Sequence, residues 1–345
     1  MISKKDSKTI IIAEAGVNHN GDINKALQLI NKAADAGADY IKFQHTNPDL
    51  ISKYAKKAKY QINNTKNNES QKSMVDRFHL DWFKAYPILI AQCKKKKIRL
   101  ITSAFSANDL SKIEKYNFDF IKIPSGEIIN YPLLEVARNS KKKIILSSGL
   151  ATIKEIKLAL DYLLKKKNKK EIFLLHCVTA YPVPYEYVNL RSLIFLSKKF
   201  SVNIGLSDHS LGIEVPIASI VMGAKIIEKH LTLSKKLNGP DHSSSLEPKE
   251  FKNMVDSIRN IEKAIGKENK IPSRIELINR SLVRQSIHAI KKINKGEVFS
   301  KSNIKLMRPA DGIEPFYFYD LIGKKSPKKY LMFQPIKKKD FKKFF

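Results

Sequence analysis

The chain has 345 residues, enough for one large domain and a small one, and its 43% hydrophobic content supports a sizeable core. Its formal net charge is +31, but the lysines are spread over every segment and no arginine–aromatic cluster indicates base stacking, which favours a solvated surface over nucleic-acid binding. No apolar run is long enough to span a membrane, the start offers no signal-peptide core, and Cys93 and Cys177 form no CxxC pair. These features predict a cytoplasmic protein without disulfides and without a cysteine metal site.

Eight runs rich in Ile, Leu and Val alternate with amphipathic helical patterns, as expected for buried parallel strands joined by helices. The expected strands are residues 9–16, 39–44, 98–105, 118–125, 142–148, 171–178, 203–209 and 225–233. The clearest helical patterns lie at 24–34, 152–164 and 250–265. Eight such units over about 260 residues predict a (β/α)8 TIM barrel of the α/β class. A doubly wound open sheet is the alternative, but no GxGxxG motif follows the first strand.

Residues 47–76 form a long polar insertion after the second strand, rich in Lys, Asn and Gln and with little core signal. Such a segment is either a lid over a binding site or a floppy surface loop. The barrel is expected to fill residues 1–268, followed by a linker at 269–280 and a small β-rich domain at 281–345. Short strand-like pieces in that domain lie at 286–290, 298–299, 304–306 and 331–333.

The strand ends carry the chemically active side chains, and in a TIM barrel those ends form the active site. Ser207 and His209 share one face of the seventh expected strand, and Glu228 and His230 share one face of the eighth, because side chains two apart point the same way. If the two strands are neighbours, two imidazoles, a carboxylate and a hydroxyl meet in one pocket. This set suits a divalent ion such as Mn²⁺, with Mg²⁺ or Co²⁺ as alternatives. Either histidine taken alone is more simply explained as a hydrogen-bonded core residue.

Two lysines, Lys42 and Lys122, lie in otherwise apolar strands, where a buried ammonium group is costly without an anionic partner. Together with the hydroxyls and glycine backbone amides of neighbouring strand ends, they would form a cradle for a phosphate and a carboxylate. The alternative is a structural network in which the lysines pair with Glu14 or Glu127.

Six motifs at these positions, taken together, resemble the sialic acid synthase family. They are AEAGVNHNG at 13–21, KFQ at 42–44, KIPSGE at 122–127, GLSDH at 205–209, EKH at 228–230 and GPDH at 239–242. The tail is similar to the antifreeze-like (SAF) domain of that family, through NKGE at 294–297, MRP at 307–309 and LIGK at 321–324. The resemblance keeps the motif order over nearly the whole chain.

The resemblance implies condensation of phosphoenolpyruvate with an open-chain N-acyl mannosamine-type sugar and water, giving a nonulosonic acid and phosphate. It implies a metal on His209 and His230 and a domain-swapped homodimer, in which Arg308 of one chain contacts the N-acyl group in the partner's barrel. The implied phosphoenolpyruvate ligands are Lys42, Ser103, Lys122, Ser125, Thr179 and Ser207. The implied sugar ligands are Glu14, Gln44, Tyr181, Asp241 and Arg308. The implied catalytic groups are Glu14, Lys122, His230 and Glu127, the last managing the attacking water.

Departures from the family pattern bear on which sugar is used. Sialic acid synthases read Ser-Thr-Pro-Phe where this chain reads Thr102-Ser-Ala-Phe105, and they have an asparagine where Thr179 stands. The stretch GPDHSSSLEP at 239–248 is similar to the legionaminic acid synthase branch. The sugar of that branch, 2,4-diacetamido-2,4,6-trideoxymannose, lacks the 6-hydroxyl and carries a second acetamido group.

The sequence therefore favours a legionaminic acid synthase over two other enzymes of the family. These are an N-acetylneuraminate synthase that uses N-acetylmannosamine and a pseudaminic acid synthase. The alternative from another functional class is a basic polyanion-binding protein with an inert barrel. The intact set of Lys, Glu and His side chains at the strand ends argues against it. A metal-dependent aldolase is the last alternative, but it would not need two phosphate-binding lysines.

Overall fold

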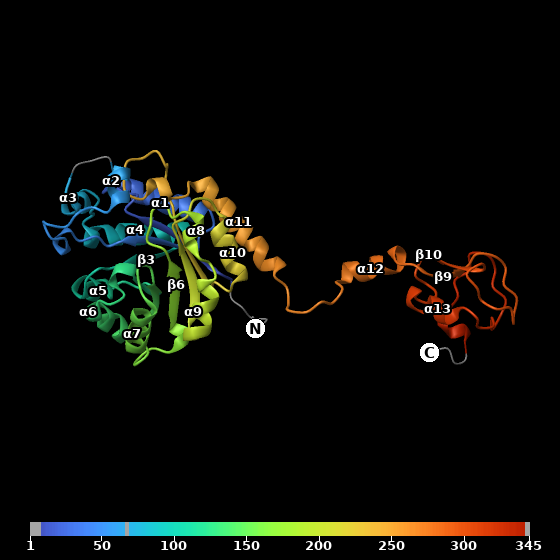
Figure 1. The fold of residues 1–345 in the computed structure, drawn as a ribbon. Helices are drawn as coiled ribbons and strands as arrows, with labels where there is room; N and C mark the ends of the chain where they lie inside the picture. Colours follow the sequence, from blue (N-terminus) through green and yellow to red (C-terminus); the bar gives the residue numbers. More distant parts are fainter. Residues whose placement is uncertain (1–7, 66–68, 342–345) are drawn as a thin grey trace. The chain divides into compact units, whose positions relative to one another are not determined.

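The computed structural model describes residues 8–65 and 69–341. Within these residues, eight parallel strands close into a barrel in chain order, which confirms the predicted TIM barrel (Figure 1). Each strand lies inside the range expected from the sequence. The strands are β1 (Ile10–Gly16), β2 (Tyr40–Gln44), β3 (Arg99–Ser103), β4 (Phe120–Ile123), β5 (Lys143–Ser147), β6 (Ile172–Cys177), β7 (Asn203–Asp208) and β8 (Ile226–His230).

Helices between the strands cover the outside of the barrel. Thr152 and Glu155 form a capping box at the start of the helix that follows β5. Along the described chain, no helix is both long and apolar enough to cross a membrane. The longer helices of the barrel unit are α1 (Ile23–Asp35), α4 (Trp82–Lys96), α5 (Ala107–Ile113), α6 (Tyr131–Asn139), α7 (Ile153–Leu163), α9 (Ser192–Phe200), α10 (Glu214–Val221) and α11 (Pro248–Ala264).

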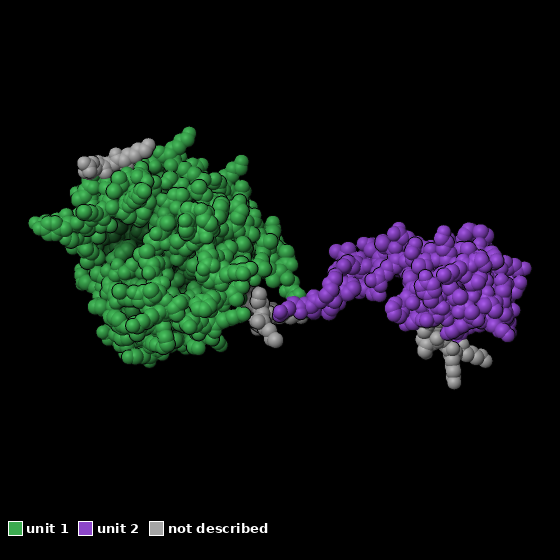
Figure 2. All heavy atoms as spheres, viewed as in Figure 1, with its two compact units in different colours: residues 1–267 green, residues 268–345 purple. Residues whose placement is uncertain are grey.

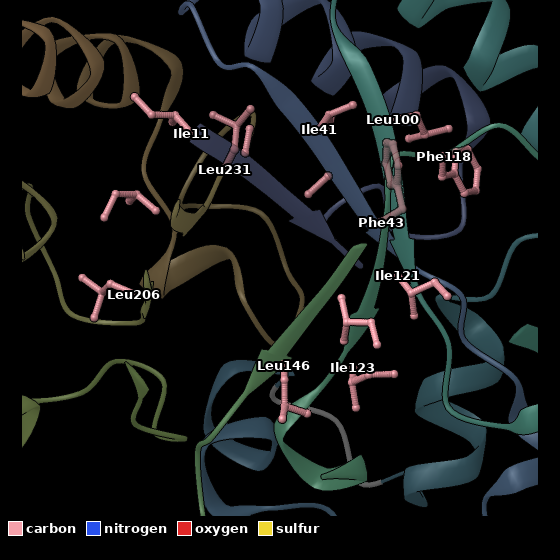
Figure 3. Packing of buried hydrophobic residues seen from close by; sticks show 14 of the residues in the cluster. Ile11, Ile41, Phe43, Leu100, Phe118, Ile121, Ile123, Leu146, Leu206 and Leu231 are labelled. Atoms are coloured by element: carbon pink, nitrogen blue, oxygen red, sulfur yellow. The ribbon is translucent and has the colours of Figure 1, made fainter. Parts of the chain in front are cut away.

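Two hydrophobic clusters show which strand side chains face the barrel axis and which face the surrounding helices. One layer packs the strands against the helices and includes Ile11, Ile41, Phe43, Ile121 and Leu146 (Figure 3). The other is a separate cluster inside the barrel, made of Ile12, Tyr40, Ile101, Phe120, Ile145, Leu175 and Ile226. Alternate residues of a strand point to opposite faces. The side chains two positions beyond the inner cluster therefore also face the axis, and they are Glu14, Lys42, Ser103, Lys122, Ser147, Cys177 and Glu228.

The insertion at 47–76, expected to be either a lid or a floppy surface loop with little core signal, carries three helical segments and a buried apolar residue. It contains η1 (Pro48–Leu50), α2 (Lys59–Thr65) and α3 (Gln71–Arg77), and residues 66–68 of it lie outside the described residues. Met74 of α3 and Phe78 are buried against Val17 in a small apolar cluster separate from the main core. These few apolar side chains at helical spacing hold α3 onto the barrel, and the polar residues around them masked the pattern in the sequence.

A second compact unit begins at Glu268 and is described by itself (Figure 2, purple). It contains α12 (Arg274–Val283), an antiparallel pair of β9 (Ser286–Ala289) and β10 (Ile304–Met307), and α13 (Phe318–Leu321). Its own hydrophobic cluster includes Ile287, Phe299 and Tyr330. A small β-containing unit was expected here, and residues 342–345 of it lie outside the described residues.

Three details of the C-terminal segment differ from the sequence expectation. Helix α12 occupies much of the stretch 269–280 that was expected to be a linker. At 298–299 there is no strand but an isolated bridge from Val298 to Lys325, beside which the Phe299 backbone bonds to Gly323 and Lys324. The described residues at 331–333 form no strand, and Phe333 has a φ of 65°, which lies outside the β region. Of these two pieces, only Phe299 belongs to the core of the unit, whereas Leu331, Met332 and Phe333 are exposed.

Candidate active site

A cavity of about 550 Å³ lies at the C-terminal ends of the barrel strands. All but one of the candidate residues from the sequence line it, some from the polar ends of the barrel strands and others from the segments that follow them. They are Glu14, Lys42, Gln44, Ser103, Lys122, Ser125, Glu127, Thr179, Tyr181, Ser207, His209, His230 and Asp241. The exception is Arg308, which belongs to the second unit and is exposed there.

Four buried charged side chains form a connected network on the cavity wall. The Nζ atom of Lys42 lies 2.5 Å from Oε2 of Glu14 and 4.0 Å from Oε1 of Glu228. The Nζ atom of Lys122 donates to both carboxylate oxygens of Glu228, at 2.8 and 2.9 Å. The two lysines thus have the anionic partners that burial requires.

Glu127 is not part of that network, which corrects one alternative from the sequence. Its carboxylate accepts a hydrogen bond from the Asn130 amide nitrogen at 2.7 Å, next to the cavity. Lys122 pairs with Glu228, which lies across the barrel on β8. Glu127 is therefore left at the cavity edge without a lysine partner among the described residues.

The carboxyl groups of the cavity are driven toward different protonation states. Burial raises the pKa of Glu14 to about 7, against the opposing effect of Lys42. Burial would also raise the pKa of Glu228, but the ammonium groups of Lys122 and Lys42 outweigh it and lower that pKa to about 2. Burial raises the pKa of Asp241 to about 6. Carboxyl groups whose pKa values are pushed apart in one cleft are typical of acid–base sites.

Hydroxyl groups without partners line the cavity beside the lysines. Among the described residues, the buried hydroxyls of Ser103, Ser147 and Thr179 have no hydrogen-bond partner. A Cβ at Gly149 would lie 2.4 Å from the Thr179 hydroxyl and 2.7 Å from that of Ser125, so only glycine leaves this space open. Buried polar groups normally have partners. These free donors beside two ammonium groups therefore form a cradle for an anionic ligand.

His209 and His230 face each other, with ring centroids 5.4 Å apart. Nδ1 of His209 donates to the carbonyl oxygen of Val178 at 2.7 Å, which leaves Nε2 for a ligand. Nδ1 of His230 is buried without a hydrogen-bond partner among the described residues and lies 3.9 Å from Asp241 Oδ2. Burial lowers the pKa of His230 well below its usual value, so this imidazole is neutral.

Two imidazoles fit a divalent ion with most of its coordination positions open. In the part of the chain that the structure describes, no group of three or more His, Cys, Asp or Glu side chains is arranged as a metal site. Two histidines alone do not make a complete protein ligand set, so a metal at this position stays a prediction. Burial lowers the pKa of His209, but Cys177, whose Sγ lies 3.9 Å from Nδ1, raises it overall.

A buried ion pair ties together the strand ends that carry the two histidines. Asp208 and Lys229 are partners in the β7–β8 register. The ammonium group of Lys229 donates to Oδ2 of Asp208 at 2.6 Å and to the carbonyl of Ser210. The Asp208 carboxylate also accepts from the backbone amide and the hydroxyl of Ser210, at 3.0 and 2.9 Å. This pair fixes the register in which His209 and His230 approach each other.

The remaining polar groups gather around Gly16 at the end of β1. A Cβ there would lie 3.1 Å from Glu14 Oε1, 3.4 Å from Gln44 Nε2 and 3.5 Å from Asp241 Oδ2. Gln44 Nε2 donates to Glu14 Oε1 at 3.2 Å. Two carboxyl groups and an amide thus converge on one side of the cavity, and they can bind several hydroxyl or amide groups of a ligand.

Comparison with known proteins identifies the family of this chain. The NeuB family profile matches residues 29–270. The chain belongs to the NeuB family. An N,N'-diacetyllegionaminic acid synthase of Campylobacter jejuni is 46% identical over 94% of this chain and 97% of its own length. A Legionella pneumophila protein of the same name is 38% identical over 91% of this chain and 89% of its own length.

A solved structure gives the same result for the fold. The N-acetylneuraminic acid synthetase of Leptospira borgpetersenii superposes with a TM-score of 0.71 and 35% identity, over 79% of this chain and 90% of that chain. The NeuB family assignment confirms the resemblance to sialic acid synthases seen in the motifs. The profile ends at residue 270, so an SAF domain in the second unit stays a prediction.

Several cavity residues of this NeuB-family chain were not assigned roles from the sequence. Glu228 was placed on the face of His230, but its contact with Lys122 was not foreseen. Cys177 follows the inner-facing Leu175 by two positions, a signal that could have placed it in the cavity. Tyr60 of α2 lies with its ring centroid 4.8 Å from that of Tyr181. No motif pointed to it, because it lies in the polar insertion.

Proposed function

We propose that this enzyme condenses phosphoenolpyruvate with 2,4-diacetamido-2,4,6-trideoxymannose and water, giving N,N'-diacetyllegionaminic acid and phosphate. The observation that carries the proposal is the meeting, in one cavity, of two buried lysines, free hydroxyls and two facing imidazoles. The choice of sugar is supported by the GPDHSSSLEP stretch at 239–248 and by the names of the Campylobacter and Legionella relatives.

Phosphoenolpyruvate binds in the lysine–hydroxyl cradle in this proposal. Lys42 and Lys122 neutralise its phosphate and carboxylate, since ammonium groups removed from water attract anions strongly. The ligand displaces part of the pairing that now joins these lysines to Glu14 and Glu228. The hydroxyls that complete the cradle are those of Ser103, Ser125, Thr179 and Ser207.

The sugar binds in open-chain form with its aldehyde toward the histidines. Glu14, Gln44 and Asp241 bind its polar groups, and the ring of Tyr181, centred 4.1 Å from that of His209, closes the side. His209 and His230 would hold Mn²⁺, or Mg²⁺ or Co²⁺, and the ion when bound polarises the sugar aldehyde.

The reaction forms one carbon–carbon bond, and at carbon 2 a bond to the water oxygen replaces the bond to the phosphate oxygen. Carbon 3 of phosphoenolpyruvate attacks the aldehyde carbon, and the aldehyde oxygen takes a proton, for which Glu14 with its pKa of about 7 is the donor. The oxygen of water bonds to carbon 2 and loses a proton, which Glu127 manages from the cavity edge. The bond between carbon 2 and the phosphate oxygen then breaks, and phosphate leaves with the electron pair. The hydroxyl left at carbon 2 becomes the keto group, and its proton goes to the phosphate.

A second subunit completes the site in this proposal. The described residues that line the cavity include no arginine, whereas Arg308 is exposed on the second unit. In a domain-swapped homodimer, the second unit acts as an SAF domain and brings Arg308 to the partner's barrel, where it contacts the N-acyl group. A cytoplasmic location of the enzyme also stays a prediction.

Phosphate release from phosphoenolpyruvate with Mn²⁺ tests the proposal. The enzyme should release phosphate faster with the trideoxy sugar than with N-acetylmannosamine, and a chelator should stop both. Faster release with N-acetylmannosamine would instead support an N-acetylneuraminate synthase, and preference for the stereoisomeric sugar of pseudaminic acid would support that enzyme. No release with any of these sugars, together with salt-sensitive binding of a polyanion, would favour the inert-barrel alternative.

A further inference from the structure

The cavity has two chemically different walls. The barrel strands contribute the charged and hydroxyl-bearing side chains described above. The other wall is apolar. It is formed by Val17, which follows β1, and by three residues in or next to the insertion, Met74, Val75 and Phe78, and all four line the same cavity. We call these four residues the apolar wall. They form a cluster of their own, separate from the main core of the barrel.

The apolar wall lies directly beside the polar groups assigned to the sugar. Gly16, around which Glu14, Gln44 and Asp241 converge within 3.5 Å of a Cβ position, is followed at once by Val17. Val17 packs with Met74 and Phe78. Because both sets of side chains line one cavity, a ligand bound by the polar group around Gly16 shares that cavity with the apolar wall.

The side chains of the apolar wall suit a methyl group better than a hydroxyl. Val17, Val75 and Phe78 carry no hydrogen-bonding side-chain group, and Met74 carries only a weakly accepting sulfur, so a hydroxyl placed against them would lose its water without gaining a good partner. Val75 is only half-buried, and Met74 has an adaptable side chain, so a small apolar group can be accommodated there. The wall therefore discriminates between sugars by the presence or absence of a hydroxyl.

We propose that the apolar wall is the subsite for the methyl group at carbon 6 of the sugar and determines the preference for a 6-deoxy substrate. The proposal rests on the proposed function and adds the residues that choose among its sugars. A hydrophobic pocket favours a methyl over a hydroxymethyl group by about 10- to 100-fold in kcat/KM. The apolar wall can distinguish a 6-deoxy sugar from a 6-hydroxy sugar. The polar group around Gly16 cannot, because its carboxyl and amide groups can form hydrogen bonds with a hydroxyl.

Two sugars that differ only at carbon 6 test this subsite: 2,4-diacetamido-2,4,6-trideoxymannose and its 6-hydroxy counterpart. The wild-type enzyme should prefer the deoxy sugar by about 10- to 100-fold. Val75→Thr keeps the shape of the side chain and adds a hydroxyl toward the cavity. It should lower the ratio of kcat/KM values at least about fivefold, mainly through better use of the hydroxy sugar, while KM for phosphoenolpyruvate stays unchanged.

Val221→Thr is the matched control, because Val221 on α10 is 65% exposed and does not line the cavity. It should leave the ratio at the wild-type value. Met74→Gln is a second variant of the wall, and thermal unfolding of each variant shows whether the fold is kept. An unchanged ratio in folded Val75→Thr and Met74→Gln, or an equal loss with both sugars, would overturn the proposal.

Direct binding separates this proposal from the proposed function. Calorimetric titration of both sugars into the enzyme with phosphoenolpyruvate and a chelator gives the affinity ratio without turnover. A preference for the deoxy sugar that falls in Val75→Thr supports the subsite even where phosphate release fails. Equal affinities of the wild type for the two sugars, or no binding of either, would overturn the subsite, whatever the outcome of the phosphate assay.

Discussion

Replacing Lys229 with methionine tests how the two histidine-bearing strands are held together. The ammonium group of Lys229 is fully buried and bonds to Asp208 and to the carbonyl of Ser210. Methionine keeps the apolar stem but leaves the Asp208 carboxylate buried without a cation. Removing one partner of a buried ion pair costs about 3–5 kcal/mol. We expect the free energy of unfolding of the barrel unit to fall by that amount.

The chain provides its own probe for this measurement. Its single tryptophan, Trp82, is buried in the barrel unit, so fluorescence during urea unfolding reports on that unit. Lys157→Met is the matched control, because Lys157 and its partner Asp161 on α7 are 64% and 56% exposed. An exposed pair of this kind contributes less than about 1 kcal/mol.

A double variant sharpens the interpretation. Asp208→Asn combined with Lys229→Met leaves no charge in the buried site, so it should be more stable than Lys229→Met alone. If Lys229→Met costs no more than Lys157→Met, the pair does not stabilise the β7–β8 junction. In that case the Asp208–Lys229 pair would also not fix how His209 and His230 approach each other.

Three further predictions follow from the site. Gly205→Ala places a Cβ 2.6 Å from the Ile226 carbonyl oxygen, so it should cost about 1–3 kcal/mol in the same assay; a neutral result would contradict the packing of β7 on β8. The pKa of Glu14 rises from 4.5 to about 7, so the folded state binds more protons and wild-type stability should fall as pH rises through that window. Glu14→Gln should make that slope shallower in urea titrations, with the raised pKa of Asp241 supplying the part that remains, and an unchanged slope would mean that Glu14 is not the group that titrates. Arg308→Ala and His230→Ala should each be nearly inactive. Co-expression of the two variants should restore about one quarter of wild-type activity, because half of the dimers are mixed and one of the two sites in each mixed dimer is intact. No recovery would exclude action across subunits.

The location of the site could be predicted because each strand changes from apolar to polar along one face. Ile12 is followed two residues later by Glu14, and Phe120 by Lys122. Side chains of one face share the barrel axis, so the alternation alone places the polar ends in a common cavity. The same argument brought His209 and His230 together before the structure was known.

Pairing across the barrel could not be predicted in the same way. Lys122 on β4 reaches Glu228 on β8, at a separation of 106 residues. Such a contact depends on barrel diameter and strand tilt, which no local pattern encodes. Glu127, which is closer in sequence, lies in a short turn whose geometry directs it to Asn130. Proximity in sequence was therefore the wrong guide to the lysine partner.

The insertion was the hardest part to predict. Its polar composition indicated a loop, yet Met74 and Phe78 bury enough apolar surface to fix α3 against Val17. Tyr60 and Val75 reach the cavity from this segment. The residues proposed to choose the sugar are thus largely those that the sequence pattern left unassigned.

The central claim is that phosphoenolpyruvate is condensed at this cavity by attack of water on carbon 2. Phosphoenolpyruvate that carries oxygen-18 in the oxygen between carbon 2 and phosphorus tests it most directly, with the sugar product and the phosphate analysed by mass spectrometry. The account predicts one phosphate for each nonulosonic acid, release only when the sugar is present, and all of the label in the phosphate. Label retained in the sugar acid, or phosphate released without sugar, would contradict it.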